Sequence, residues 1–221
     1  MDSIAFEFCD AVVGTIKYLP WMNVPISDEK WNKALQDHSA NRKRFQLCLG
    51  YYDDDDKWSY YLYNTEFGSS TPFATLLKRV GPKYLRIDYI KMLAGRSLIE
   101  TSKEELHVLL NRLQSMQPFF NFPSLLLNDV ASKVPESDLD QLLSSFAKIN
   151  ISAFYSRCNG RSAIEFAKQL IQQDTLVNVI VIQRERGMLS AAVADYRATR
   201  RVLHYVTQKV EVYVTTLWFV R

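Results

Sequence analysis

Residues 157–162, with the sequence RCNGRS, carry side chains that bind anions or act as nucleophiles. The run falls between an expected strand and the start of an expected helix, where free backbone N–H groups and the helix dipole attract anions. Arg157 and Arg161 would add charge for a phosphate or a phosphopeptide. Cys158 would become a nucleophile if a base lay beside it. The alternative is an Asn-Gly turn, a structural cysteine and a helix cap at Ser162.

Other patterns of catalytic or metal-binding type are incomplete. Four aspartates occupy 53–56, but an EF-hand loop needs glycine at its sixth position and glutamate at its twelfth, where this chain has Trp58 and Asn64. His38, His107 and His204 have no metal-ligand spacing. There is no phosphate-binding GxGxxG or Walker sequence. We therefore expect no catalytic residue, no metal site and no cofactor.

The charge pattern gives only a weak indication of nucleic-acid binding. The net charge is +3, and arginines gather near the C-terminus at 184, 186, 197, 200 and 201. Such a group could attract RNA or an acidic peptide. A stacking platform also needs interleaved aromatic residues, and only Tyr196 and Tyr205 lie nearby. A solvated helix face is the simpler interpretation, and nucleic acid is an unlikely partner.

Composition indicates a folded intracellular protein. The 221 residues are 48% hydrophobic and 13% aromatic, enough for the core of one domain or a small pair. Cys9, Cys48 and Cys158 form an odd number without a CxxC pair, which favours a reducing compartment, cytoplasmic or nuclear. Acidic residues occupy the place of a signal peptide, and no apolar run could span a bilayer.

Four short apolar segments, separated by helical patterns, predict the fold. They cover 85–90, 125–130, 151–156 and 177–182. Such alternation is typical of parallel βα units. Capping boxes are expected at Thr101/Glu104 and at Ser162/Glu165. The last two strand-to-strand steps are equal, which suggests leucine-rich-repeat-like βα repeats with a curved parallel sheet, although the strict leucine-rich consensus is absent.

The segments before residue 81 follow different periods. Residues 1–42 read as two helices, the second capped by Ser27. Alternating apolar residues then predict a β-hairpin whose acidic tip is 53–56, followed by a short helix to Val80. We divide the chain into a helical segment (1–42), a hairpin with a short helix (43–80) and a βα-repeat domain (81–221).

The end of the chain is harder to interpret. A fourth helix is expected over 187–199. Residues 210–220 are strongly β-forming, and they form either a closing edge strand or part of a longer structure.

Rings gather on the expected hairpin. Trp58, Tyr61 and Tyr63 fall on both faces of its second strand, so one face should be partly exposed or covered by the N-terminal helices. Exposed aromatics are frequent where partners dock. Packing against the helix that holds Trp31 is the alternative.

Several stretches resemble nematode-expanded F-box and F-box-associated (FTH-like) proteins. They are the opening MDSIAFEFCDAVV, WNKALQDHSANRKRF at 31–45, KWSY at 57–60, KYLRI at 83–87 and SRCNG at 156–160. The resemblance implies a helical N-terminus that docks on a Skp1-like protein and repeats that hold a target. Ala5 replaces the usual proline, and 21–44 does not clearly provide a third F-box helix. The resemblance is therefore to a degenerate or incomplete F-box.

Together these features predict an α/β protein that recognises other proteins and is not an enzyme. It resembles a substrate adaptor of an SCF-type ubiquitin ligase, with a Skp1-like protein and an unknown target as partners. The expected partner-binding residues are Phe8, Val12, Trp31, Trp58, Tyr61, Tyr63, Arg157 and Arg161. The alternatives are a small α/β enzyme using Asn128, Asp129, Arg157 and Cys158 at the carboxyl ends of the strands, or a weak RNA-binding protein.

Overall fold

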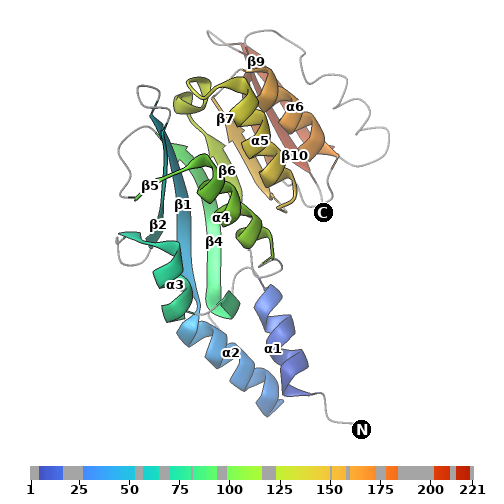
Figure 1. Cartoon of the computed structure of the whole chain (residues 1–221). Coiled ribbons are helices and arrows are strands. Elements are labelled where there is room, and N and C mark those ends of the chain that lie inside the picture. Colours follow the sequence, from blue (N-terminus) through green and yellow to red (C-terminus); the bar gives the residue numbers. More distant parts are fainter. Residues whose placement is uncertain are drawn as a thin grey trace.

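The computed structural model describes residues 5–16, 27–52, 57–64, 70–80, 82–93, 99–115, 123–149, 151–157, 160–172, 178–183, 202–209 and 213–219. Within these ranges the chain forms six α-helices, two short 3-10 helices and ten strands (Figure 1). Outside the described residues lie the expected helix at 187–199, the aspartates at 53–56, Cys158 and the five C-terminal arginines.

The two N-terminal helices are present as expected. They are α1 (Phe6–Thr15) and α2 (Glu29–Asn41). Their apolar stripes meet in a small cluster in which Cys9, Val13 and Ala34 are fully buried. This cluster is separate from the main core, so the two helices form a helical pair with an apolar centre of its own.

The cap of α2 is Asp28, so the expectation of Ser27 is wrong by one residue. The Asp28 Oδ1 atom accepts hydrogen bonds from the backbone N–H groups of Lys30 (2.9 Å) and Trp31 (3.2 Å). These are two of the four N–H groups that a helix start leaves without an internal partner.

The next segments form the expected hairpin and a short helix. β1 (Lys43–Tyr52) pairs antiparallel with β2 (Lys57–Asn64), and β3 (Ser70–Thr71) adds to β2. Helix α3 (Phe73–Val80) and a 3-10 turn, η1 (Pro82–Tyr84), then lead to β4 (Leu85–Leu93).

The βα alternation continues from there. β5 (Ile99–Thr101) pairs with β2 and precedes α4 (Lys103–Ser115). The remaining elements up to the last parallel strand are β6 (Ser124–Leu127), η2 (Asp129–Ser132), α5 (Glu136–Ala147), β7 (Ala153–Ser156), α6 (Arg161–Ile171) and β8 (Asn178–Gln183).

A capping box opens α4, one residue later than expected. The backbone N–H of Glu105 donates to Ser102 Oγ, and the N–H of Ser102 donates to Glu105 Oε2, both at 3.2 Å. The expected Thr101/Glu104 pair does not form this box, because Thr101 is the last residue of β5.

The capping box expected at α6 is absent. This helix starts after Gly160, and Ser162 already lies in its first turn. Its hydroxyl donates to Glu136 Oε1 of α5 at 3.4 Å. Glu165 pairs instead with Lys168 at 2.7 Å.

Two antiparallel strands close the far side of the sheet. β10 (Tyr213–Phe219) lies between β8 and β9 (Val202–Lys209) and pairs antiparallel with both. Within the β-forming segment at 210–220, residues 213–219 therefore form an interior strand of the described sheet. β9 was not expected, and it occupies the edge position.

All described strands join in one ten-stranded mixed sheet. Its order is β3-β2-β1-β4-β6-β7-β8-β10-β9, and β5 is attached to β2. β1, β4, β6, β7 and β8 are parallel neighbours. Of the segments predicted at 85–90, 125–130, 151–156 and 177–182, residues 85–90, 125–127, 153–156 and 178–182 lie in adjacent strands of the same direction. The expected strand at 125–130 is too long, because η2 begins at Asp129. The protein is confirmed as mixed α/β.

Regular leucine-rich-like repeats are not confirmed. The register aligns Ile90 with Leu125, Leu125 with Phe154 and Phe154 with Val179, and each step along the chain is shorter than the one before. One continuous core reaches from Phe45 in β1 to Ile171 in α6. Strands from 43–80 and from 81–221 therefore lie in a single sheet, and the core described for residues 45–171 is continuous.

Candidate functional site

Among the described residues, helices cover one of the two faces of the parallel strands. Alternate residues of β1, β2, β4, β6 and β7 belong to the main core, together with the buried sides of α3 to α6. Figure 1 shows α4, α5 and α6 lined up on one side of the sheet. The intervening residues point to the opposite side, because side chains alternate along a strand.

These intervening residues form two rows across the sheet, which we call the open face. In cross-strand order the first row is Tyr63, Gln46, Tyr89, Ser124 and Ala153, and the second is Tyr61, Cys48, Lys91, Leu126 and Tyr155. No helix within the described residues packs on these rows.

The open face exposes large rings. Tyr63 is 37% exposed and Tyr89 is 39% exposed, while Leu126 and Tyr155 are half-buried. Parallel sheets are normally covered on both faces. A bare face of this composition therefore has the character of a docking surface.

The Cys48 thiol is a packed group of the open face. It is 3% exposed and lies between Tyr61 and Lys91 in the register. Burial raises the pKa of Cys48 above its ordinary value. Burial and the hydrogen bond to Cys48 raise the pKa of Tyr61 to about 12. Both groups are neutral at physiological pH, so Cys48 is no nucleophile here.

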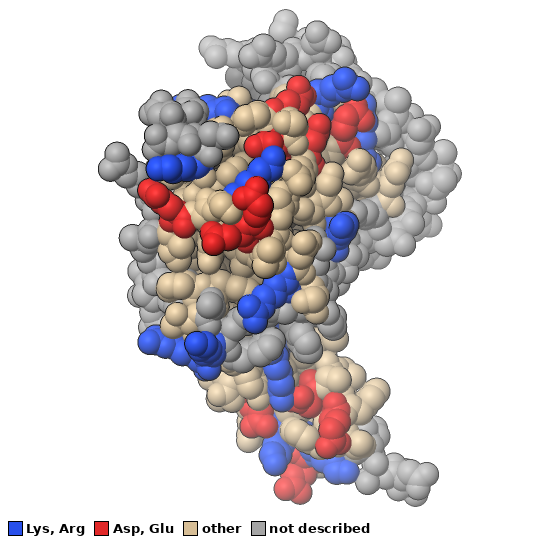
Figure 2. Space-filling model, viewed as in Figure 1, with Lys and Arg blue, Asp and Glu red and all other residues tan. Residues whose placement is uncertain are grey.

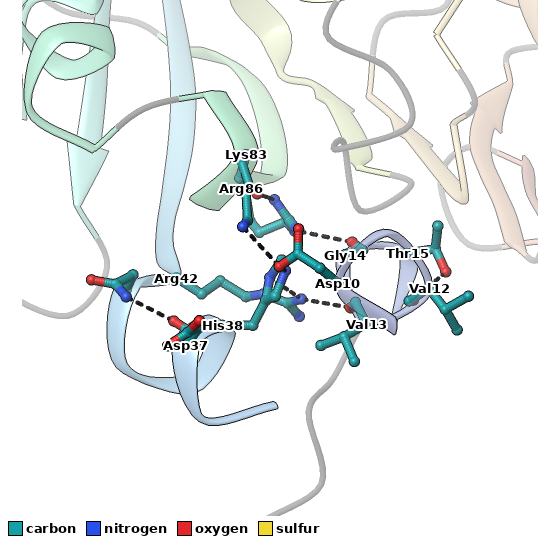
Figure 3. Close-up of polar contacts among 11 residues, drawn as sticks. Asp10, Val12, Val13, Gly14, Thr15, Asp37, His38, Arg42, Lys83 and Arg86 are labelled. Carbon is teal, nitrogen blue, oxygen red and sulfur yellow. Dashed lines mark hydrogen bonds and ion pairs between the residues drawn. The ribbon is translucent and has the colours of Figure 1, made fainter. Parts of the chain in front are cut away.

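A second polar feature lies where the helical pair meets the sheet (Figure 3). Arg42 follows α2 and donates to the carbonyls of Ile16 (2.7 Å) and Val13 (3.0 Å). Arg86 of β4 donates to the carbonyl of Gly14 at 2.8 Å. We call these two side chains the arginine clamp. They bind the end of α1, where carbonyls lack helical partners and the helix dipole is negative.

The arginine clamp is held in place by further contacts. Arg86 is fully buried and also donates to the carbonyls of Lys83 and Leu85, both at 2.8 Å. Burial lowers the pKa of Arg86 to about 10, so the guanidinium stays charged at neutral pH. Lys83 forms an ion pair with Asp10 of α1 at 2.7 Å. Polar bonds thus tie α1 to η1 and β4.

His38 lies inside this cluster and is fully buried. Its Nδ1 is 3.3 Å from an Arg42 nitrogen, and its Nε2 is 3.2 Å from Asp10 Oδ1. Because arginine can only donate, we infer that Nδ1 accepts and that the proton of the neutral ring is on Nε2. Burial and the charge of Arg42 lower the pKa of His38, while Asp10 acts in the opposite direction.

Acid is expected to loosen α1. The folded pKa of His38 lies below its unfolded value near 6.5, so the docked state binds fewer protons. The stabilisation is complete above about pH 6.5 and is lost as the pH falls toward the folded pKa. The groups that face the ring are Asp10 of α1, Arg42 after α2, Lys83 and Tyr84 of η1, and Arg86 of β4.

Hydrogen exchange of α1 amides, corrected for intrinsic rates, measures this effect. Protection of α1 relative to α6 should fall between pH 7.5 and 5.5 in the wild-type chain. His38→Gln should remove that pH dependence. An identical pH dependence in both proteins would show that another group is responsible.

The predicted partner-binding residues fall in three places. Phe8, Val12 and Trp31 lie on the helical pair, where Phe8 is 55% exposed and its ring is 6.2 Å from that of Trp31. Trp31 therefore packs on α1, within the helical pair. Tyr61 and Tyr63 lie together on the open face.

The prediction that Trp58 contacts a partner is wrong. Trp58 is 3% exposed and packs on Tyr51 with ring centroids 5.1 Å apart. It alternates with Lys57 and Ser59, so the strand directs its indole into the core beneath the helices.

Arg157 and Arg161 are exposed near the start of α6. The hydroxyl of Ser162 contacts Glu136, so a carboxylate already lies beside this helix start. Asn128 and Arg157 follow adjacent parallel strands, and the Arg157 N–H donates to the Leu127 carbonyl at 2.9 Å. Cys158 lies outside the described residues.

Sequence reasoning predicted only Tyr61 and Tyr63 of the ten residues in the two rows, and among those it missed are the large side chains of Tyr89, Lys91, Leu126 and Tyr155. A signal was present in β4, where Tyr89 and Lys91 alternate with the core residues Ile90 and Met92. The run Leu125–Leu127 carries no such contrast, because all three side chains are leucine.

The helix-covered side differs from the open face. Figure 2 shows this side with acidic and basic side chains interspersed over the helices. Lys103 pairs with Asp138 across α4 and α5, and Lys168 pairs with Glu165 on α6. Such mixed charge is typical of a solvated surface.

Comparisons with protein-family models, with curated proteins and with solved structures found no match. Among the described residues, no helix has both the length and the apolarity needed to cross a bilayer. The same residues contain no group of three or more His, Cys, Asp or Glu that could hold a metal ion.

Proposed function

We propose that this chain is a non-catalytic protein-recognition module that binds its partner on the open face of the sheet. The observation that carries the proposal is a row of parallel strands whose second face is rich in tyrosine and carries no helix within the described residues. Arrays of βα units use such faces as extended binding surfaces. Tyrosine is favoured there because it combines a large contact area with a hydroxyl.

The resemblance to F-box-associated proteins extends this proposal. In that setting the open face would hold the target of an SCF-type ubiquitin ligase, in the cytoplasm or nucleus. The helical pair would contact a Skp1-like subunit, and the exposed Phe8 with the half-buried Val12 and Trp31 would provide its apolar contact.

Photo-crosslinking tests the open face. A photoreactive phenylalanine analogue replaces Tyr63 or Tyr89 in the full chain, and the protein is irradiated in an extract of its source cells. Val108 provides the matched control, because it is 66% exposed but lies on α4, on the covered side. We expect one protein to be linked from both tyrosine positions and not from Val108.

Substitution gives the complementary result. Tyr63→Ser with Tyr89→Ser should weaken capture of that protein about tenfold or more, since truncation of an aromatic anchor costs over 1 kcal/mol. Val108→Ser should leave capture unchanged. Two results would refute the proposal. One is equal crosslinking from all three positions, and the other is equal capture of the partner by the wild-type chain and by the double tyrosine variant.

A further inference from the structure

The open face carries one ammonium group at its centre. Lys91 is on β4, which lies between β1 and β6 in the sheet. Its cross-strand neighbours in the register are Cys48 and Leu126, and its Nζ lies 5.1 Å from the centre of the Tyr89 ring. None of these three neighbours carries a carboxylate.

No carboxylate among the described residues forms an ion pair with Lys91. Asp88 lies at the bulge of β4 and is engaged by Arg44, with Nε and Oδ2 2.6 Å apart. Glu100 lies opposite Ser59 in the register of β5 and β2, at the margin of the sheet. The strands β2 and β1 therefore separate Glu100 from β4. The three strand spacings between β5 and β4 place Glu100 about 14 Å from Lys91. This exceeds the screening length of about 8 Å at physiological salt, so the two charges interact weakly.

We propose that the partner is a protein that places an Asp or Glu carboxylate on Lys91, between apolar side chains seated on Tyr89 and Leu126. This inference rests on the proposed function, since it specifies what the open face binds. A half-buried cation loses hydration when a partner covers it, and an opposite charge is the strongest compensation for that loss.

A protein fits this surface better than a nucleic acid does. Binding along a phosphate backbone needs several cations in a line, each releasing a counterion. The two rows of the open face contain a single lysine, surrounded by tyrosine, leucine, cysteine and small polar residues. Charge complementarity therefore calls for one carboxylate inside an apolar contact.

Carbodiimide coupling tests the contact directly, because this reagent joins a lysine amine to a carboxylate that touches it. The protein captured through Tyr63 and Tyr89 is mixed with the full wild-type chain and coupled. We expect mass spectrometry to find an amide bond between Lys91 and an Asp or Glu of the partner. Lys78, exposed on α3, provides the control lysine.

The affinity of the complex provides the second measurement. Lys91→Gln removes the charge and keeps an unbranched polar side chain that is one bond shorter, and it should weaken binding about tenfold or more. Lys78→Gln should change nothing. Circular dichroism of each variant shows that the fold is intact.

The two proposals fail differently. If the tyrosine substitutions abolish capture but Lys91→Gln binds normally and no Lys91 amide forms, the carboxylate inference is overturned and the recognition surface stands. If capture does not depend on the tyrosines, both fall. Salt-sensitive binding of single-stranded RNA that Lys91→Gln weakens, without any protein partner, would also overturn both.

Discussion

Replacing Arg86 with alanine is expected to destabilise the protein by about 3 kcal/mol, with the loss concentrated at α1. The guanidinium donates to three backbone carbonyls, those of Gly14, Lys83 and Leu85, all at 2.8 Å. The side chain is fully buried, so water cannot freely replace it at these carbonyls. Hydrogen bonds from a charged donor contribute more than neutral ones.

Urea unfolding, with hydrogen exchange of α1, measures this loss. Arg161→Ala is the matched control, because Arg161 is exposed and its removal should cost less than about 0.5 kcal/mol. Arg86→Lys should recover little, since an ammonium cannot reproduce the planar fork of donors. An Arg86→Ala protein with normal stability and a protected α1 would show that the arginine clamp does not hold this helix.

Replacing Phe154 with alanine is expected to cost about 3–5 kcal/mol of folding stability. Phe154 is fully buried on β7, and its ring lies 5.3 Å from that of Phe166 of α6 in an edge-to-face arrangement. It occupies the same register position as Leu125 on β6, in the continuous core. The substitution would leave a cavity between the sheet and its helix layer.

Tyr155→Ala is the control for this experiment, because it removes a ring from the adjacent residue on the opposite face. Tyr155 is half-buried, and we expect a clearly smaller loss in the urea midpoint. Equal losses at Phe154 and Tyr155 would mean that both faces of β7 are equally packed, and would contradict the open face.

The main strands and helices were predictable because their signals are local. The segment at 151–156 is short and apolar and is followed by a helical pattern, which predicts a buried strand in a βα unit. Phe154 could be assigned to the core region in this way. The same reasoning missed β9, because polar residues of Val202–Lys209 occupy both its odd and its even positions. The segment therefore lacks the apolar–polar alternation that predicts a strand with one buried face.

Helix starts were less well predicted, for a reason visible at α4. The sequence Thr101-Ser102-Lys103-Glu104-Glu105 offers two capping boxes one residue apart. Both fit the local rule. Pairing of β5 with β2 uses Thr101 as a strand residue, and only this tertiary contact selects Ser102 and Glu105.

The sequence by itself determined the alternation of strands and helices, because apolar periodicity acts within a few residues of the chain. Only the tertiary structure decided that no helix of the described residues covers the second face of the sheet, which leaves Tyr89 exposed and Lys91 half-buried there. It also decided that His38, Arg42 and Arg86 gather around the end of α1. Along the chain Arg42 lies 29 residues from Val13 and Arg86 lies 72 residues from Gly14, so their meeting at the end of α1 is a property that no local pattern encodes.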